Sequence, residues 1–94
     1  MAREKIGTVT EFREKETQGE EFKAEVTIQL SGKIKNNSKV ALLGPVAYNP
    51  AKVTKIEIKG EETEKAGEND EAKLTISSNE KINVRENTTA YKMT

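Results

Sequence analysis

The chain has 94 residues, of which 33% are hydrophobic and 34% are charged, and its formal net charge is zero. It contains no cysteine and no histidine, which excludes disulfides, thiolate nucleophiles, Cys-ligated metals and the commonest general base and transition-metal ligand. We therefore expect a single domain spanning residues 1–94, with a thin core, no enzymatic activity, no cofactor and no metal site.

The first candidate strand begins at Ile6, near the N-terminus. Most of its apolar and hydroxyl side chains fall on one face, and Val9 falls on the opposite face. The residues predicted to share the first face are Ile6, Thr8, Thr10 and Phe12.

The clearest periodic segment runs from Phe22 to Ile34. Its even positions are apolar and its odd positions are polar, which is the period of a β-strand with one solvent-exposed face. Gly32 interrupts the apolar series, and we interpret it as a bulge or bend where the strand passes from one sheet to another. The apolar members are Phe22, Ala24, Val26, Ile28, Leu30 and Ile34.

Shorter segments with the same period follow in the second half of the chain. Ser78-Asn79-Glu80 is short enough to be the turn of a tight hairpin that joins residues 72–77 to residues 81–86. The shorter candidate strands are 55–59, 72–77, 82–85 and a final segment that contains Tyr91 and Met93.

Turns and charged loops, the latter near residues 13–20 and 60–71, separate these candidate strands. No segment carries the apolar stripe of an amphipathic helix. Six or seven short strands with frequent turns predict an all-β fold, a small antiparallel β-sandwich or barrel with little or no helix.

The least polar stretch is VALLGPVAYNP, residues 40–50, which holds both prolines of the chain. Its first four residues are all apolar, so a strand here has apolar side chains on both faces, and each face must pack against another part of the protein or a partner. Gly44-Pro45 is expected to break that strand, and Pro50 to separate Val46–Tyr48 from the next strand near Lys52.

A plain buried strand is one interpretation of this stretch, and a surface that binds a partner is the other. The candidate partner-binding residues are Leu42, Leu43, Val46 and Tyr48, with Lys39 and Lys52 at the rim.

Zero net charge conceals a basic segment at residues 31–59, where six lysines face a single carboxylate, Glu57. An OB-like or SH3-like barrel that binds nucleic acid through this segment is the first alternative function. A pocket near residues 43–50 for a small anionic ligand such as a nucleotide is the second. The candidate anion-binding residues are Lys33, Lys35, Lys39, Lys52 and Lys55.

A simpler interpretation is that these lysines protect strand edges and cover solvated faces. The segment has one aromatic residue and no arginine, so bidentate phosphate recognition is missing from it. The acidic run at residues 61–71 does not have EF-hand spacing, and we expect it to be hydrated or to pair with the lysine segment of a neighbouring subunit.

These features together predict a non-enzymatic module for protein interaction or self-assembly. We expect a homo-oligomer or a protein partner, with nucleic acid less favoured and no membrane association. No apolar run approaches the roughly 18 residues of a membrane span, and MAREKIGTV lacks the apolar core of a signal peptide. The expected location is therefore the cytoplasm of a cell or of an infected host. The composition is also typical of small accessory proteins, including virus-encoded ones.

Overall fold

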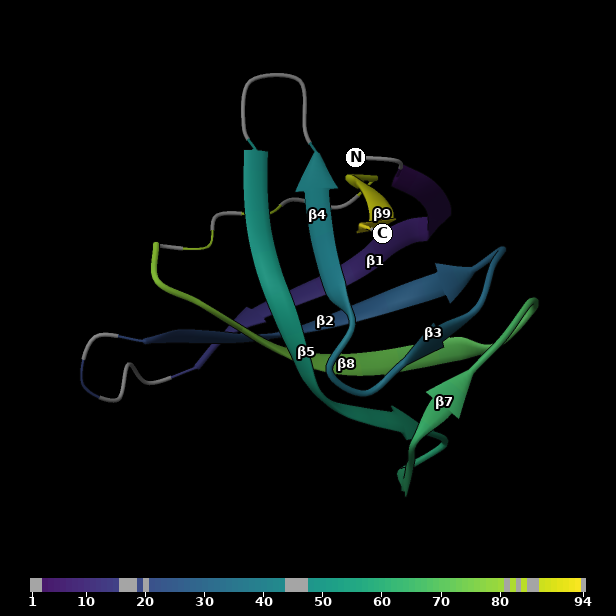
Figure 1. Cartoon of the computed structure of the whole chain (residues 1–94). Helices are drawn as coiled ribbons and strands as arrows, with labels where there is room; N and C mark the ends of the chain where they lie inside the picture. Colours follow the sequence, from purple (N-terminus) through teal and green to yellow (C-terminus); the bar gives the residue numbers. More distant parts are fainter. Residues whose placement is uncertain are drawn as a thin grey trace.

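The structure is a computed structural model that describes residues 3–15, 19, 21–43, 48–80, 82, 84 and 87–93, and none of these residues is helical. Strands account for most of the described chain (Figure 1). They are β1 (Arg3–Glu14), β2 (Phe22–Leu30), β3 (Ile34–Lys35), β4 (Lys39–Leu43), β5 (Tyr48–Ile58), β6 (Glu61–Thr63), β7 (Lys65–Ala66), β8 (Glu71–Ser78) and β9 (Thr89–Met93).

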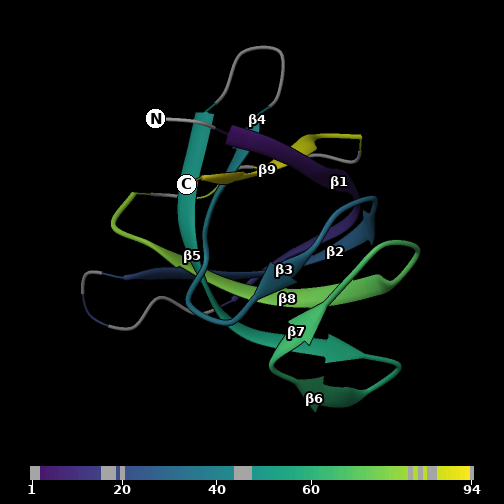
Figure 2. The ribbon, with the colours of Figure 1, turned by 45° about the vertical axis from the view of Figure 1, so that its right-hand side comes forward.

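Seven of these strands form one antiparallel sheet in the order β4-β9-β1-β2-β8-β5-β6. An additional antiparallel pairing of β4 with β5 closes the sheet on itself, so all of its strands except β6 form a barrel. The strands β3 and β7 make a separate two-stranded sheet, which Figure 2 shows in front of β2 and β8. The all-β prediction is confirmed, and the fold is a barrel.

The barrel interior is filled by the apolar side chains that alternate along each strand. In β2, Ala24, Val26 and Ile28 are fully buried, as the period-two pattern predicts. The β4 residues Val40 and Leu42 belong to the same core. The largest fully buried side chains are Ile6, Ile28, Leu42, Ile56, Leu74, Ile76, Val9, Val26, Val40 and Val53.

The strand β1 departs from simple alternation. Ile6 and Val9 are both fully buried in the core, although they differ in parity. Register shifts between Lys5 and Gly7, against β9, and between Val9 and Glu11, against β2, account for this. The prediction that Val9 lies opposite Ile6 was therefore wrong, because β-bulges change which side chains point inward.

The interpretation of Gly32 as a bend between two sheets is confirmed. The ladder of β2 with β8 ends near Leu30, and the chain resumes as β3, which pairs with β7 rather than with the barrel. The segment predicted as one charged loop, 60–71, is more ordered than expected. It contains β6 and β7, and backbone hydrogen bonds join Asp70 and Asn69 to Leu30.

Two boundary predictions were wrong. Pro50 does not end a strand, because β5 runs without a break from Tyr48 to Ile58. Pairing of β5 with β8 begins only at Lys52, so Pro50 sits where the strand has β4 as its sole barrel neighbour, and an edge position tolerates proline.

After β8, the described residues Ile82 and Val84 are buried in the core but are not strand residues, so the predicted hairpin is absent there.

We predict that Gly7→Ala destabilises the barrel by about 2–4 kcal/mol. A Cβ atom at Gly7 would lie 2.3 Å from the backbone oxygen of Gln29 and 2.7 Å from Ile28 Cγ2, so β1 and β2 would have to separate. Urea unfolding measures the change in free energy.

The matched control is Gly67→Ala, because a Cβ atom at Gly67 meets nothing within 4 Å. It should change the unfolding free energy by less than about 0.5 kcal/mol. Equal midpoints for the two variants would contradict the close approach of β1 and β2.

Candidate protein-binding face

The strand β4 places one set of side chains inside the barrel and the other set outside. Val40 and Leu42 belong to the core cluster, so Lys39, Ala41 and Leu43 lie on the opposite face of the strand, where Ala41 is fully covered. The cross-strand register aligns outward residues of the neighbouring strands with them. We call this surface the β4 face, and its described members are Arg3, Lys5, Thr8, Lys39, Ala41, Leu43, Pro50, Lys52, Thr89, Tyr91 and Met93.

The β4 face is apolar in its middle and cationic at one end, where Arg3, Lys39 and Lys52 share a register row with Met93. Leu43, Pro50, Tyr91 and Met93 are each half-buried, and Ala41 lies between Pro50 and Tyr91 in the register. The cations are Arg3, Lys5, Lys39 and Lys52, all exposed.

No carboxylate stands among the described members of the β4 face, and none of its four cations forms an ion pair with a described residue. Arg3 Cζ instead lies 4.9 Å from the centroid of the Tyr91 ring, a cation–π contact. Lys39 and Lys52 are direct cross-strand partners, and like charges in that position are unfavourable. Two carboxylates do stand near this face, because Glu21 and Glu80 line a pocket together with Lys39 and Lys52.

The structure separates the predicted partner-binding residues. Leu42 is fully buried in the core, so it is not available to a partner. Leu43 lies on the β4 face, half-buried. Tyr48 occupies the position opposite Leu43, with its side chain outside the described structure, and Val46 lies outside the described residues altogether.

Sequence reasoning missed the contribution of β9 to this surface. Tyr91 and Met93 were noted as strand residues, and their alternation with Ala90 was a usable signal of an outward face. Pairing between β4 and β9 joins segments about 50 positions apart, so the sequence alone did not place Tyr91 beside Ala41.

The predicted anion-binding lysines occupy three separate places. Lys33 and Lys35 line a pocket beside β3, whereas Lys39 and Lys52 lie on the β4 face. Lys55 Nζ forms an ion pair at 3.3 Å with Glu57 Oε1. The basic segment 31–59 is therefore not one continuous binding surface, because successive lysines fall on different strands and faces.

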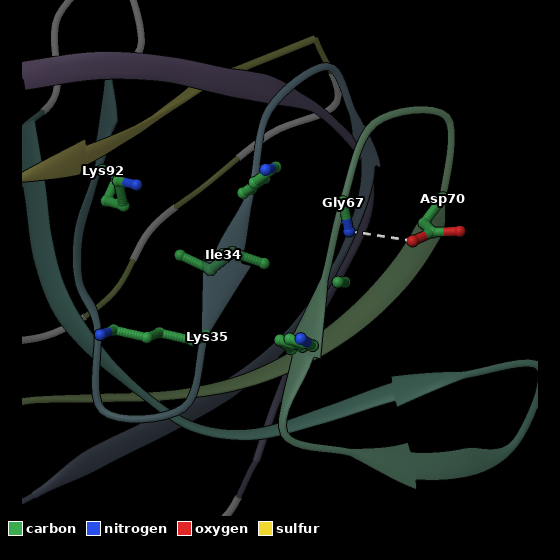
Figure 3. Close-up of a pocket in the computed structure, with 8 residues that line it drawn as sticks. Ile34, Lys35, Gly67, Asp70 and Lys92 are labelled. Atoms are coloured by element: carbon green, nitrogen blue, oxygen red, sulfur yellow. Dashed lines mark hydrogen bonds between the residues drawn. The ribbon is translucent and has the colours of Figure 1, made fainter.

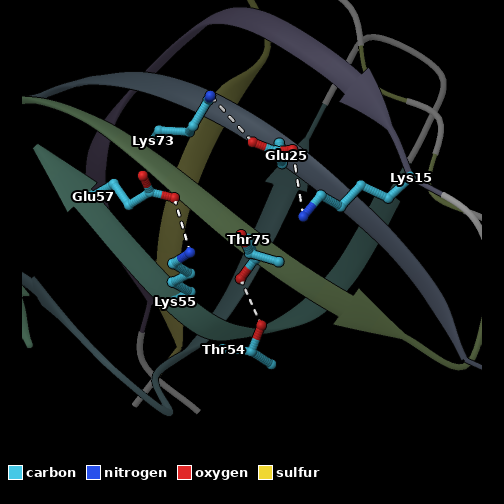
Figure 4. Close-up of polar contacts among 7 residues, drawn as sticks. All are labelled: Lys15, Glu25, Thr54, Lys55, Glu57, Lys73 and Thr75. Atoms are coloured by element: carbon cyan, nitrogen blue, oxygen red, sulfur yellow. Dashed lines mark hydrogen bonds and ion pairs between the residues drawn. The ribbon is translucent and has the colours of Figure 1, made fainter. Parts of the chain in front are cut away.

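The outer face of β1, β2, β8 and β5 has the opposite character (Figure 4). Glu25 forms two ion pairs, one between Oε1 and Lys15 Nζ at 3.4 Å and one between Oε2 and Lys73 Nζ at 3.2 Å. Thr54 Oγ1 donates a hydrogen bond to the backbone oxygen of Thr75 at 3.1 Å. Charges of both signs alternate there and neutralise one another. The four cations of the β4 face, in contrast, form no ion pair with a described residue.

Glu25 has the one clear pKa shift among the described residues. Partial burial acts to raise the pKa of this carboxyl, but hydrogen bonds and charges from Lys73 and Lys15 outweigh it and lower the pKa. A group whose pKa is lowered on folding stabilises the fold while it is ionised.

Neither a metal centre nor a membrane-spanning helix is found in the described part of the chain. No cluster of three or more acidic ligands that could hold a metal occurs there, and no helix in it is long and apolar enough to cross a membrane.

Comparison with known proteins gives the fold. The structure is similar to two crystal structures of the Saccharomyces cerevisiae Ski7 GTPase-like domain, one bound to GDP and inorganic phosphate and one bound to GTP, with TM-scores of 0.83 and 0.82 at 7% identity. Each similarity covers 97% of this chain and 23% of the Ski7 chain, so this chain spans less than a quarter of that domain.

A neighbour of similar size is the C-terminal domain of a putative U32 peptidase from Geobacillus thermoleovorans. It has a TM-score of 0.69 and 18% identity, and the similarity covers 97% of this chain and 93% of that one. No protein-family model matches this chain, and no curated protein sequence matches it significantly. At such low identities the neighbours show that the chain is a small β-barrel domain.

We predict that the stabilisation from Glu25 is lost in acid. Because the pKa of Glu25 is lower folded than unfolded, its contribution is complete above its ordinary value of 4.5 and disappears as the pH falls through the folded value. Glu25→Gln should cost roughly 0.5–1 kcal/mol at pH 7 in low salt, with partial screening by solvent, and little near pH 3.

Urea unfolding at a series of pH values measures this difference. A matched control is Glu57→Gln, which removes the single ion pair with Lys55 and should cost less at pH 7. A pH-independent difference between wild type and Glu25→Gln would show that the two lysines do not stabilise the ionised carboxyl.

Proposed function

We propose that this barrel is a non-enzymatic protein-interaction domain whose β4 face binds a partner segment that has apolar side chains next to acidic ones. The observation that carries the proposal is the composition of that face: partly buried apolar side chains lie beside four cations that form no ion pair with a described residue. Interfaces are typically apolar at the core with a polar rim, and Tyr, Met and Arg are enriched in them.

Charge favours a different protein over a second copy as the partner. Two-fold pairing of β4 faces would bring Arg3, Lys5, Lys39 and Lys52 of each copy against the same four cations of the other. Such like-charge contact opposes association, whereas a partner rich in carboxylates would be attracted to the four cations. Self-assembly through this face is therefore the less favoured form of the interaction.

The Geobacillus neighbour supports an accessory role. It is described as the C-terminal domain of a putative U32 peptidase, so a barrel of this fold can serve as one domain of a larger protein. A fold alone does not determine function, and the chemistry of the β4 face is what directs this proposal to an acidic protein segment.

We predict that the isolated chain binds a fluorescent peptide of alternating Glu and Phe, and does not bind the same peptide with each Glu replaced by Lys. Lys39→Glu/Lys52→Glu should weaken binding about ten-fold or more, since rim charges accelerate encounter and each lost charged contact costs on the order of 1.5 kcal/mol. Tyr91→Ala should weaken binding by a similar factor. Fluorescence anisotropy at low salt measures both effects.

The control is Lys55→Glu/Lys59→Glu, which changes the net charge equally at positions outside the β4 face. Equal loss in the two double variants would mean that net charge alone attracts the peptide, which would refute the proposal. Steeply salt-dependent retention on single-stranded DNA without peptide binding would favour nucleic acid instead.

We predict that the chain is a monomer at micromolar concentration in light scattering. A dimer whose mass falls in Leu43→Lys would instead support self-assembly through the β4 face. That result would overturn the choice of a different protein as partner.

A further inference from the structure

A pocket of about 560 Å³ lies beside the small β3–β7 sheet, apart from the β4 face (Figure 3). Its volume is within the range of small-molecule sites. Ile34 of β3 and Ala66 of β7, both nearly fully buried, form an apolar floor. The remaining lining residues are Lys33, Lys35, Lys65, Gly67, Asp70 and Lys92.

Four lysines from three segments line this pocket, and the described carboxylate among its lining residues is Asp70. Asp70 Oδ2 accepts a hydrogen bond from the Gly67 backbone N–H at 2.9 Å, which braces the wall of the pocket. The backbone N–H of Leu30 donates to the backbone oxygen of Asp70 at 2.9 Å, and the backbone N–H of Asn69 donates to the backbone oxygen of Leu30 at 3.0 Å. The acidic residue thus has a structural role, and the wall that it stiffens is held in place without a ligand.

The lysine charges are poorly compensated. Lys35 and Lys65 are direct cross-strand partners in the β3–β7 pair, a like-charge arrangement that opposes pairing. Neither they nor Lys33 form an ion pair with a described residue. Lys92 Nζ lies 3.6 Å from Glu4 Oε2, and the Glu4 side chain is 61% exposed, so solvent weakens that pair. A bound anion would relieve the repulsion between Lys35 and Lys65.

We propose that this pocket binds a small organic molecule that carries two or more phosphate groups. Lysine binds phosphate as a compact point charge, and several lysines around one cavity match a ligand with several charged groups. The floor of Ile34 and Ala66 suits an apolar body attached to those phosphates. A single carboxylate would leave most of the four ammonium groups unpaired, so the geometry selects for a polyanion.

The test is isothermal titration calorimetry on the full chain at low salt with three probes: ADP, inorganic tripolyphosphate and adenosine. We expect ADP and tripolyphosphate to bind and adenosine not to bind. ADP should have the larger binding free energy per phosphate group, because its base reaches the apolar floor. Absence of binding by both phosphate probes at millimolar concentration overturns the proposal. Tripolyphosphate binding without ADP binding overturns the role of the apolar floor.

Variants locate the site. Lys65→Glu turns the cross-strand pair with Lys35 into an attractive one, so the fold should be retained while ADP affinity falls about ten-fold or more. Glu4→Gln frees Lys92 and should raise ADP affinity. The control Lys59→Glu changes the net charge as Lys65→Glu does, at an exposed turn residue outside the pocket lining. Equal losses of ADP affinity in Lys59→Glu and Lys65→Glu would overturn the assignment.

These measurements are independent of the β4 face. Lys39→Glu/Lys52→Glu should leave ADP affinity within about two-fold, because neither lysine lines the pocket and exposed charges at a distance are largely screened. A loss of ADP binding in that double variant as large as in Lys65→Glu would place the anion on the β4 face and overturn this second site.

Discussion

The antiparallel ladder between β4 and β5 is the contact on which the rest of this structure depends. It joins the two strands that would otherwise leave an open edge in the sheet order, and so converts a sheet into a barrel. Closure removes unpaired backbone groups along those strands and encloses a core that a chain with 33% hydrophobic residues could not otherwise shield. Figure 1 shows β4 and β5 side by side.

The same ladder creates the surface that is proposed to bind. Once Val40 and Leu42 are committed to the core, Lys39, Ala41 and Leu43 must face outward, and the register sets Lys52 and Pro50 against them. The closed barrel also brings β9 to the other side of β4, which supplies Tyr91 and Met93. The apolar centre of the β4 face and its cationic end are therefore consequences of closing the barrel with this register.

The exterior has one region where opposite charges form ion pairs and two regions where lysines lie opposite lysines. On the β1–β2–β8–β5 side, Glu25 between Lys15 and Lys73 illustrates a surface whose ion pairs satisfy one another. On the β4 face and around the β3–β7 pocket, lysines oppose lysines across strand pairs, at Lys39 with Lys52 and at Lys35 with Lys65. Such arrangements cost stability, and ligands of opposite charge are the simplest compensation for them.

The sequence by itself determined the strand content, the wet and dry faces of β2, the bend at Gly32 and the absence of cysteine and histidine chemistry, because these depend on residue type and local period. It did not determine barrel closure, the bulges of β1 or the course of β5 through Pro50. Nor did it show that the basic segment 31–59 divides among three places. Those features depend on pairing between distant segments, and a shift of one residue in register exchanges the inside of a strand for its outside. Only the tertiary structure could decide that Leu42 is core while Leu43, one residue later, lies beside β9 on an exposed face.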